Sequence, residues 1–159
     1  MRVGIGFDAH RFSGDPGPLV LGGVSIDHAS GLAGHSDGDV VSHAVVDAVL
    51  GAVALGDIGM HFPSSDERWR DAPSRGFLEE AVRLAREAGY RLANVDVTVI
   101  CEAPRLDPFR DVIGSSLAEC LAVGARDVSV KATTTDEMGF TGRGEGIAAI
   151  AVALLESDS

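Results

Sequence analysis

The feature that most limits the fold is a run of apolar residues at helical spacing between Asp39 and Ala54. The apolar positions are Val40, Val41, Ala44, Val45, Ala48, Val49 and Ala52. Asp37 or Asp39 is available as the N-cap, because a short side-chain oxygen can accept from the free amides of a first turn. The pattern therefore predicts the first helix of the chain.

Segments typical of strands surround this helix and alternate with further helical ones. A Gly-Gly pair at 22–23 predicts a tight hairpin within residues 19–26. A cap at Ser74 and a stop at Gly89 bound a second helix, and residues 57–70 have no period and are predicted to be a loop. The other predicted elements are strands at 3–7, 94–100, 128–132 and 147–155 and a helix around 109–121. This order predicts an α+β fold, with a mixed β-sheet packed against helices and an N-terminal hairpin.

Size and charge narrow the class of protein. The chain has 159 residues, of which 45% are hydrophobic, so we expect a single domain over residues 1–159. The formal net charge of -11 disfavours a nucleic-acid partner, because such binding depends on clustered Lys and Arg. An acidic protein that handles phosphate must neutralise it locally, which favours a metal ion at the site.

Nothing in the sequence indicates export or a membrane. Cys101 and Cys120 form no disulfide pattern, which favours a reducing compartment. The apolar run at the N-terminus is too short for a secretory signal, and the run from Ile147 to Leu155 is too short for a membrane helix. We therefore expect a cytoplasmic protein without a membrane partner.

Two potential metal ligands, Asp8 and His10, lie two residues apart at the predicted end of the first strand. Side chains at this spacing point to the same face of extended backbone. His43, on the predicted helix, would complete an Asp/His/His set that suits zinc with one position open to substrate. The alternative is a structural core histidine at His43 and a turn residue at Asp8. The spacing alone leaves both interpretations open.

The predicted helix also offers partners for His43. Asp39 and Asp47 lie four residues before and after it. Each could accept the second ring proton of a metal-bound imidazole, which usually needs such a partner. The alternative is that both are cap or solvent-exposed carboxylates.

Other polar residues suit phosphate chemistry. His35 and Ser36 precede the helix, whose free amides and dipole favour an anion, although a capping segment would have the same appearance. Residues 133–137 offer hydroxyls and carboxylates that suit Mg²⁺ or Mn²⁺ bridging two phosphates, or else form a solvated loop. Neither the glycines at 4–6 nor those at 142–146 complete a dinucleotide or P-loop motif.

Four segments together resemble the 2-C-methyl-D-erythritol 2,4-cyclodiphosphate synthase family. They are GFDAHRF at 6–12, HSDGD at 35–39, DIGMHFP at 57–63 and the polar loop at 131–146. The resemblance runs from Arg2 to Leu155 with family-like order and spacing. It implies a phosphorus-oxygen lyase that converts 4-diphosphocytidyl-2-C-methyl-D-erythritol 2-phosphate to the 2,4-cyclodiphosphate and CMP, in non-mevalonate isoprenoid biosynthesis.

The resemblance implies two metal ions. Asp8, His10 and His43 would hold one Zn²⁺ per subunit. Asp136 would hold Mg²⁺ or Mn²⁺ together with the substrate. The family commonly has Glu at that position, so neighbouring Glu137 leaves this second assignment open.

The resemblance also implies a substrate site in which His35 and Thr134 position the transition state. Arg105 stands where lysine is common, and Ser64 replaces a common aspartate. The expected substrate contacts are His35, Ser36, Asp57, Ile58, Gly59, Ile100, Ala103, Pro104, Arg105, Leu106, Ala132, Thr133 and Thr134.

Members of the family form homotrimers whose sheets face a central axis and whose active sites are shared between neighbours. Residues matching Phe140 and Arg143 hold an isoprenoid diphosphate in the central cavity of some members. We expect this chain to act without a fused cytidylyltransferase. Two rival functions are a metal-dependent nucleotide pyrophosphatase and a non-catalytic trimer whose metal serves assembly or isoprenoid sensing.

Overall fold

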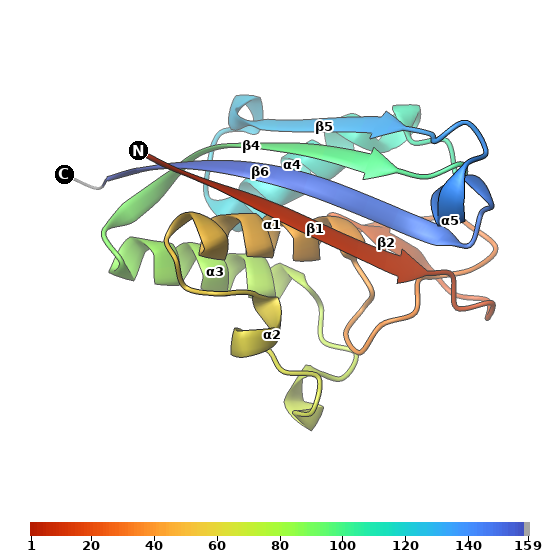
Figure 1. Ribbon diagram of the computed structural model, residues 1–159, viewed down its shortest axis with the longest axis horizontal. Coiled ribbons are helices and arrows are strands. Elements are labelled where there is room, and N and C mark those ends of the chain that lie inside the picture. Colours follow the sequence, from red (N-terminus) through yellow and green to blue (C-terminus); the bar gives the residue numbers. More distant parts are fainter. Residues whose placement is uncertain (158–159) are drawn as a thin grey trace.

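A mixed four-stranded sheet organises the fold (Figure 1). The computed structural model describes residues 1–157. The strands are β1 Arg2–Arg11, β4 Tyr90–Ile100, β5 Val128–Thr133 and β6 Gly146–Ser157, in the spatial order β1-β6-β4-β5. β6 pairs antiparallel with both β1 and β4, whereas β4 and β5 are parallel. β1 and β5 are therefore the two edges of the sheet.

Three long helices cover one face of this sheet: α1 Val40–Ala52, α3 Arg75–Glu87 and α4 Arg110–Leu121 (Figure 1). A hairpin of β2 Leu19–Leu21 and β3 Val24–Ile26 forms a second, two-stranded sheet. The shorter helices are α2 Ile58–His61, α5 Gly139–Gly142, η1 Glu67–Trp69, η2 Asp107–Phe109 and η3 Ala125–Asp127. The predicted α+β class, with a mixed sheet, helices and a hairpin, is confirmed. Within residues 1–157, no helix is long and apolar enough to cross a membrane.

Three local predictions are wrong. β1 pairs with β6 as far as Arg11, so Asp8 and His10 lie inside the strand and not at its end. The predicted loop at 57–70 contains α2 and η1, whose first turns are capped by aspartates. Ser74 does start α3, but its side chain makes no capping hydrogen bond.

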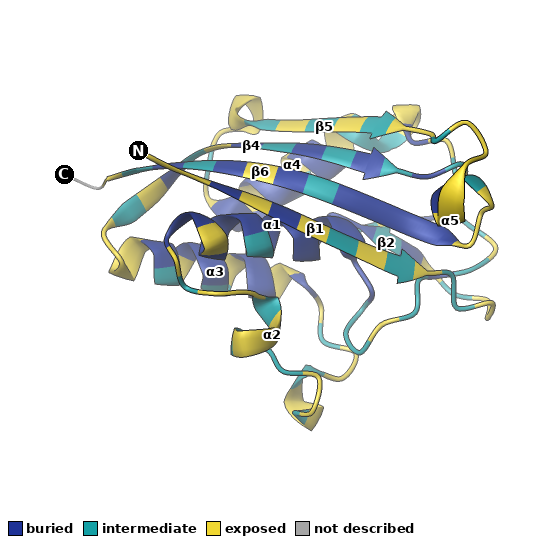
Figure 2. Cartoon of the chain, in the orientation of Figure 1, coloured by how far each residue is buried: buried dark blue, intermediate teal, exposed yellow. Residues whose placement is uncertain are grey.

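The first helix packs directly on β1 because two glycines of β1 lie under it. A Cβ added to Gly4 would lie 2.0 Å from the carbonyl oxygen of Ala48, and one added to Gly6 would lie 1.9 Å from that of Ala44. Only glycine allows backbones to approach so closely. The helix itself is almost entirely buried, as its dark colour in Figure 2 shows. This contact brings the first turn of α1 over the carboxyl end of β1.

Among residues 1–157, no helix covers the opposite face of the sheet, which we call the open face. On β1 and β6 it presents cross-strand pairs of apolar residues in register: Val3 with Leu154, Ile5 with Val152, and Phe7 with Ile150. The β1 members are 57% to 70% exposed, and Figure 2 shows their positions as exposed bands that alternate with buried ones. The chain therefore leaves an apolar stripe uncovered.

Candidate active site

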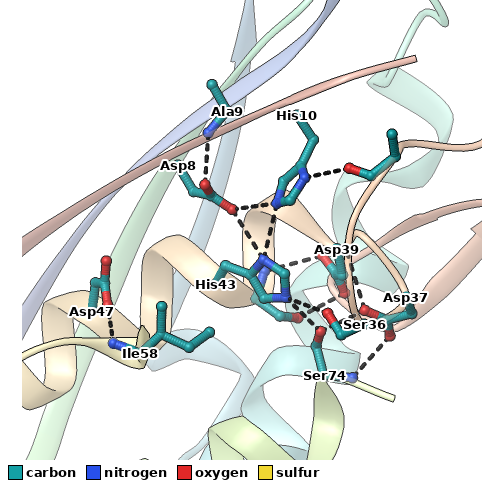
Figure 3. A network of polar contacts seen from close by, with 12 residues as sticks. Asp8, Ala9, His10, Ser36, Asp37, Asp39, His43, Asp47, Ile58 and Ser74 are labelled. Atoms are coloured by element: carbon teal, nitrogen blue, oxygen red, sulfur yellow. Dashed lines mark hydrogen bonds and ion pairs between the residues drawn. The ribbon is translucent and has the colours of Figure 1, made fainter. Parts of the chain in front are cut away.

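Asp8 and His10 of β1 and His43 of α1 converge on one point (Figure 3). The Asp8 Oδ2 atom lies 2.8 Å from His10 Nε2 and 3.0 Å from His43 Nδ1, and the two ring nitrogens are 3.2 Å apart. Residues 8 and 10 share the helix-covered face because side chains alternate along a strand. His43 faces them because α1 rests on the β1 glycines.

This cluster has the composition of a metal site. One carboxylate and two imidazoles are a donor set that zinc accepts in catalytic centres, and the ligand atoms all lie within 4.8 Å of one another. A hydrogen bond on the side away from the cluster orients the His10 ring, since its Nδ1 lies 2.6 Å from the carbonyl oxygen of Ala33. That acceptor requires the proton on Nδ1 and leaves Nε2 directed at the cluster. The residues present therefore fit a divalent cation.

Electrostatics inside the cluster agree with this assignment. Burial would raise the pKa of Asp8, but its hydrogen bonds with His10 and His43 outweigh burial and hold that pKa well below its usual range. For His10 burial would lower the pKa, yet the hydrogen bond with the Asp8 carboxylate prevails and raises it. Asp8 is thus kept as a carboxylate that attracts positive charge, whether from a proton or from a metal ion.

A cavity of about 310 Å³ opens over the cluster. Its lining combines the three candidate ligands with polar residues and an apolar wall. The lining residues are Asp8, His10, His35, Ser36, His43, Ile58, Gly59, Phe62, Ser64, Trp69 and Phe77. Of the predicted substrate contacts, His35, Ser36, Ile58 and Gly59 lie here. Asp57 is not part of the lining, and its carboxylate accepts from the Met60 amide at 3.0 Å as the cap of α2.

A second cavity, of about 440 Å³, lies at the carboxyl ends of β4 and β5. Its lining is Cys101, Glu102, Pro104, Arg105, Leu106, Asp107, Ala132, Thr133 and Thr134. The last three residues and the loop 104–106 were predicted to contact substrate, whereas Ile100 and Ala103 are not among the lining residues. The two cavities belong to opposite edges of the sheet, because β1 carries the first and β5 carries part of the second.

Comparison with known proteins identifies the family. The model of the YgbB family matches residues 1–156. The chain belongs to this family. It is 55% identical over 157 residues to 2-C-methyl-D-erythritol 2,4-cyclodiphosphate synthase of Idiomarina loihiensis, an alignment that covers 99% of this chain and 98% of that one. The resemblance noted in the sequence is therefore confirmed.

Two further relatives define the relationship more closely. A bifunctional enzyme IspD/IspF of Erythrobacter litoralis is 57% identical over 153 residues, which are 96% of this chain but only 39% of the relative. The chain therefore spans well under half of that bifunctional protein. The solved CDP-bound form of a 2C-methyl-D-erythritol-2,4-cyclodiphosphate synthase superposes with a TM-score of 0.89 at 35% identity and covers 98% of this chain and 100% of the solved one. The relatives of Idiomarina loihiensis and Pectobacterium atrosepticum are both named as synthases of this cyclodiphosphate, and the chain is an enzyme of the lyase class.

Residues 133–137, which we call the threonine loop, form a hydrogen bond with Glu102 in the lining of the second cavity. The amide of Thr135 donates to the Glu102 carboxylate at 3.1 Å, and the Thr135 hydroxyl lies 2.6 Å from the carbonyl oxygen of Met138. Asp136 and Glu137 follow with positive φ of 51° and 63°, and both side chains are exposed. Neither belongs to a cluster of three potential metal ligands within the described residues.

Phe140 and Arg143 lie on and just after α5. Phe140 is 40% exposed, and the Arg143 guanidinium donates to the Glu145 carboxylate at 2.6 Å. Within one chain Arg143 thus has an acidic partner already.

Neither Asp39 nor Asp47 contacts the ring of His43, and Asp39 is the N-cap of α1, which is the alternative that the sequence left open. Asp39 accepts from the amides of Gly22 and Gly23 at 2.8 and 2.7 Å and from Ser42, so the hairpin turn and the helix cap occupy it. Asp47 accepts from the amide of Ile58 at 2.7 Å and so anchors α2. Both carboxylates lie on α1 or at its start, and Figure 3 shows Asp47 directed at Ile58.

The ring of His43 instead contacts two serines. Its Nε2 lies 2.9 Å from the hydroxyl of Ser74 and 3.1 Å from that of Ser36. Ser74 and its partner Asp37 were not predicted as site residues, nor was Glu102. The HSDGD motif contains Asp37, but only the tertiary fold brings the start of α3 to it.

Proposed function

We propose that this chain converts 4-diphosphocytidyl-2-C-methyl-D-erythritol 2-phosphate to 2-C-methyl-D-erythritol 2,4-cyclodiphosphate and CMP. The observation that carries the proposal is the convergence of Asp8, His10 and His43 beneath a cavity in a chain of the YgbB family. An oxygen of the 2-phosphate attacks the β-phosphorus, the bond from that phosphorus to the α-phosphate oxygen breaks, and CMP leaves with the electron pair. The reaction consumes no water.

We assign the ligands of two metal ions to residues of this chain. Asp8, His10 and His43 would hold Zn²⁺, and Asp136 would hold Mg²⁺ or Mn²⁺ that arrives with the substrate. When bound, these cations supply Lewis acidity and neutralise phosphate charge. Asp136 and Glu137 follow Thr134 of the second cavity in the chain, and their exposed carboxylates support a site there, since hard cations prefer such oxygens.

The other residues bind and orient the substrate. His35 and Ser36 lie in the cavity with the triad and would donate to the phosphate nearest to it. The apolar wall of Ile58, Phe62 and Phe77 would exclude water from the attacked phosphorus, which separates cyclisation from hydrolysis. Thr134, in the second cavity, would position the leaving CMP. Such positioning is the main catalytic work in phosphoryl transfer.

The second cavity is the proposed nucleoside site. Leu106, Pro104 and Ala132 offer apolar surface for a base, and Arg105 and Thr133 offer donors at its rim. Ile100 and Ala103 would contribute through backbone around this loop. A structure neighbour of the same family is named as a CDP-bound form, which supports a cytidine diphosphate ligand.

A homotrimer with shared active sites would unite the two cavities. Within one chain they lie at opposite edges of a four-stranded sheet, which separates them by about three strand spacings of 4.8 Å. The apolar stripe of Val3, Ile5 and Phe7 on the open face is the surface that neighbouring copies would cover. An isoprenoid diphosphate in the central cavity would require Arg143 to exchange Glu145 for phosphate.

The test is to incubate purified protein with the substrate and Mg²⁺, with and without a zinc chelator, and to follow products by ³¹P NMR. A cyclic diphosphate and CMP that appear only with metal support the proposal. A linear phosphate with CMP would identify a pyrophosphatase instead. Absence of turnover by metal-loaded protein would favour a non-catalytic trimer.

A further inference from the structure

The tautomer of His43 determines which of its nitrogens can bind a metal ion. Nδ1 faces Asp8 and His10, and Nε2 points away from them toward α3 (Figure 3). A neutral imidazole binds a metal ion only through the nitrogen that lacks the proton. For Nδ1 to serve as the ligand atom, the proton must therefore lie on Nε2 and have an acceptor there.

Asp37 is placed to create that acceptor. Its carboxylate receives three donors: the Ser74 amide at 2.8 Å, the Ser74 hydroxyl at 2.5 Å and the Asp39 amide at 3.2 Å. A carboxylate can only accept, so the Ser74 hydroxyl must donate its single proton to Asp37. The lone pairs of that hydroxyl are then left for His43, whose Nε2 lies 2.9 Å away.

The position of Ser74 in its own helix supports a dedicated role. Ser74 occupies the N-cap of α3, where a serine hydroxyl normally accepts from the helix amides. Here the side chain makes no such bond, and the residue is fully buried. Its hydroxyl is committed to Asp37 and His43 instead.

We propose that Asp37 and Ser74 form a relay that holds His43 in the Nε2–H tautomer and thereby presents Nδ1 to the metal ion. Both are positioning residues, because they act through His43 and do not line the first cavity. The relay rests on the proposed zinc assignment of Asp8, His10 and His43. It also gives Ser36 a separate role: Ser36 lies 3.1 Å from the same nitrogen, but its hydroxyl is bonded to no carboxylate within residues 1–157, which leaves it free for phosphate.

Zinc affinity of the metal-free protein, measured without substrate by competition with a chromophoric chelator, tests the relay. Loss of an outer-shell partner typically weakens metal binding about 10–100-fold. We expect that loss for Ser74→Ala, and a change below about threefold for Ser36→Ala, the matched control at the same ring nitrogen. Thermal unfolding of the metal-free variants provides a separate readout, since a purely structural serine would shift that transition while leaving zinc affinity unchanged.

Asp37→Asn tests the direction of the hydrogen bonds and keeps the size of the side chain. The Ser74 amide can only donate, so the new amide oxygen must face it and the new NH₂ group must face the Ser74 hydroxyl, while the Asp39 amide loses its acceptor at 3.2 Å. The hydroxyl then becomes free to donate to Nε2, which selects the wrong tautomer of His43. We expect zinc affinity to fall by a factor similar to that of Ser74→Ala, and the double variant to lose no more than either single one.

The outcomes separate the relay from the metal site itself. Wild-type protein that takes up no stoichiometric zinc would overturn the zinc assignment and the relay together. Wild-type protein that binds zinc, with Ser74→Ala and Asp37→Asn binding it equally well, would overturn the relay alone. Equal weakening by Ser36→Ala and Ser74→Ala would also contradict it, because the relay assigns the two serines different roles.

Discussion

Gly6 lies directly under the carbonyl oxygen of Ala44, at a distance where a Cβ atom would approach that oxygen to 1.9 Å. The contact sets the height of α1 above β1. It therefore also sets the distance from His43 to Asp8 and His10, since these side chains come from the same two elements. The close packing that requires glycine at position 6 therefore also fixes the geometry of the metal cluster.

Gly6→Ala should destabilise the fold, because neither backbone can move without disturbing the sheet or the helix. We expect a loss of about 1–3 kcal/mol in the free energy of unfolding, measured by urea denaturation. Gly51→Ala is the matched control, since Gly51 lies in α1 with open space around it. That change should stabilise the protein by about 0.5–1 kcal/mol, because alanine favours the helix. Equal stability of the two variants would contradict the packing argument.

Asp47→Ala should impair substrate use more than metal binding. The Asp47 carboxylate accepts from the Ile58 amide at 2.7 Å and so fixes the start of α2 beside the first cavity. Charged hydrogen bonds contribute about 1.5–3 kcal/mol, so we expect kcat/KM to fall by about 10–100-fold. Zinc affinity should stay within about threefold of wild type, because Asp47 does not contact the triad. A parallel loss of zinc affinity would show that the residue acts on the metal cluster instead.

Asp136→Ala and Glu137→Ala should have different effects on the dependence on magnesium. If Asp136 binds the second cation, its loss should raise the Mg²⁺ concentration needed for half-maximal activity by about tenfold or more, which corresponds to about 1.4 kcal/mol. Glu137→Ala should leave that concentration nearly unchanged. Steady-state rates over a Mg²⁺ titration measure both. The reverse result would assign the second cation to Glu137.

Phe7→Glu should weaken self-association. Phe7 is 57% exposed on the open face, in register with Ile150 of β6, so the change places a charge inside the apolar stripe. Light scattering coupled to size-exclusion chromatography should show a trimer for the wild type and smaller species for the variant. Val112→Glu is the control, because Val112 is 48% exposed but lies on α4, away from the open face. A monomeric wild type, or a trimeric Phe7→Glu variant, would contradict the proposed interface.

Much of the fold could be predicted because the signals are local. The apolar spacing of residues 39–54 predicts α1 within two residues of its observed bounds, and Gly22 and Gly23 mark the hairpin. The alternation of side chains along a strand places Asp8 and His10 on one face even though the predicted strand is too short. These signals depend only on backbone geometry.

The surroundings of His43 could not be predicted in the same way. Spacing of four residues suggests Asp39 and Asp47 as its partners, because side chains at that interval lie on one side of a helix. In the folded chain Asp39 is occupied by the hairpin amides and Asp47 by Ile58, so neither is available. The partner that remains, Ser74, comes from the start of another helix.

The sequence by itself determined the long helices and the strands, the residue types of a metal site and the membership of the YgbB family, because periodicity and motif are properties of neighbouring residues. Tertiary structure decided which atoms meet. It brought His43 over β1 through two glycines, turned its second nitrogen toward Ser74 and Asp37, and placed the two cavities at opposite edges of the sheet. These relationships depend on distances between segments far apart in the chain, which local patterns do not encode.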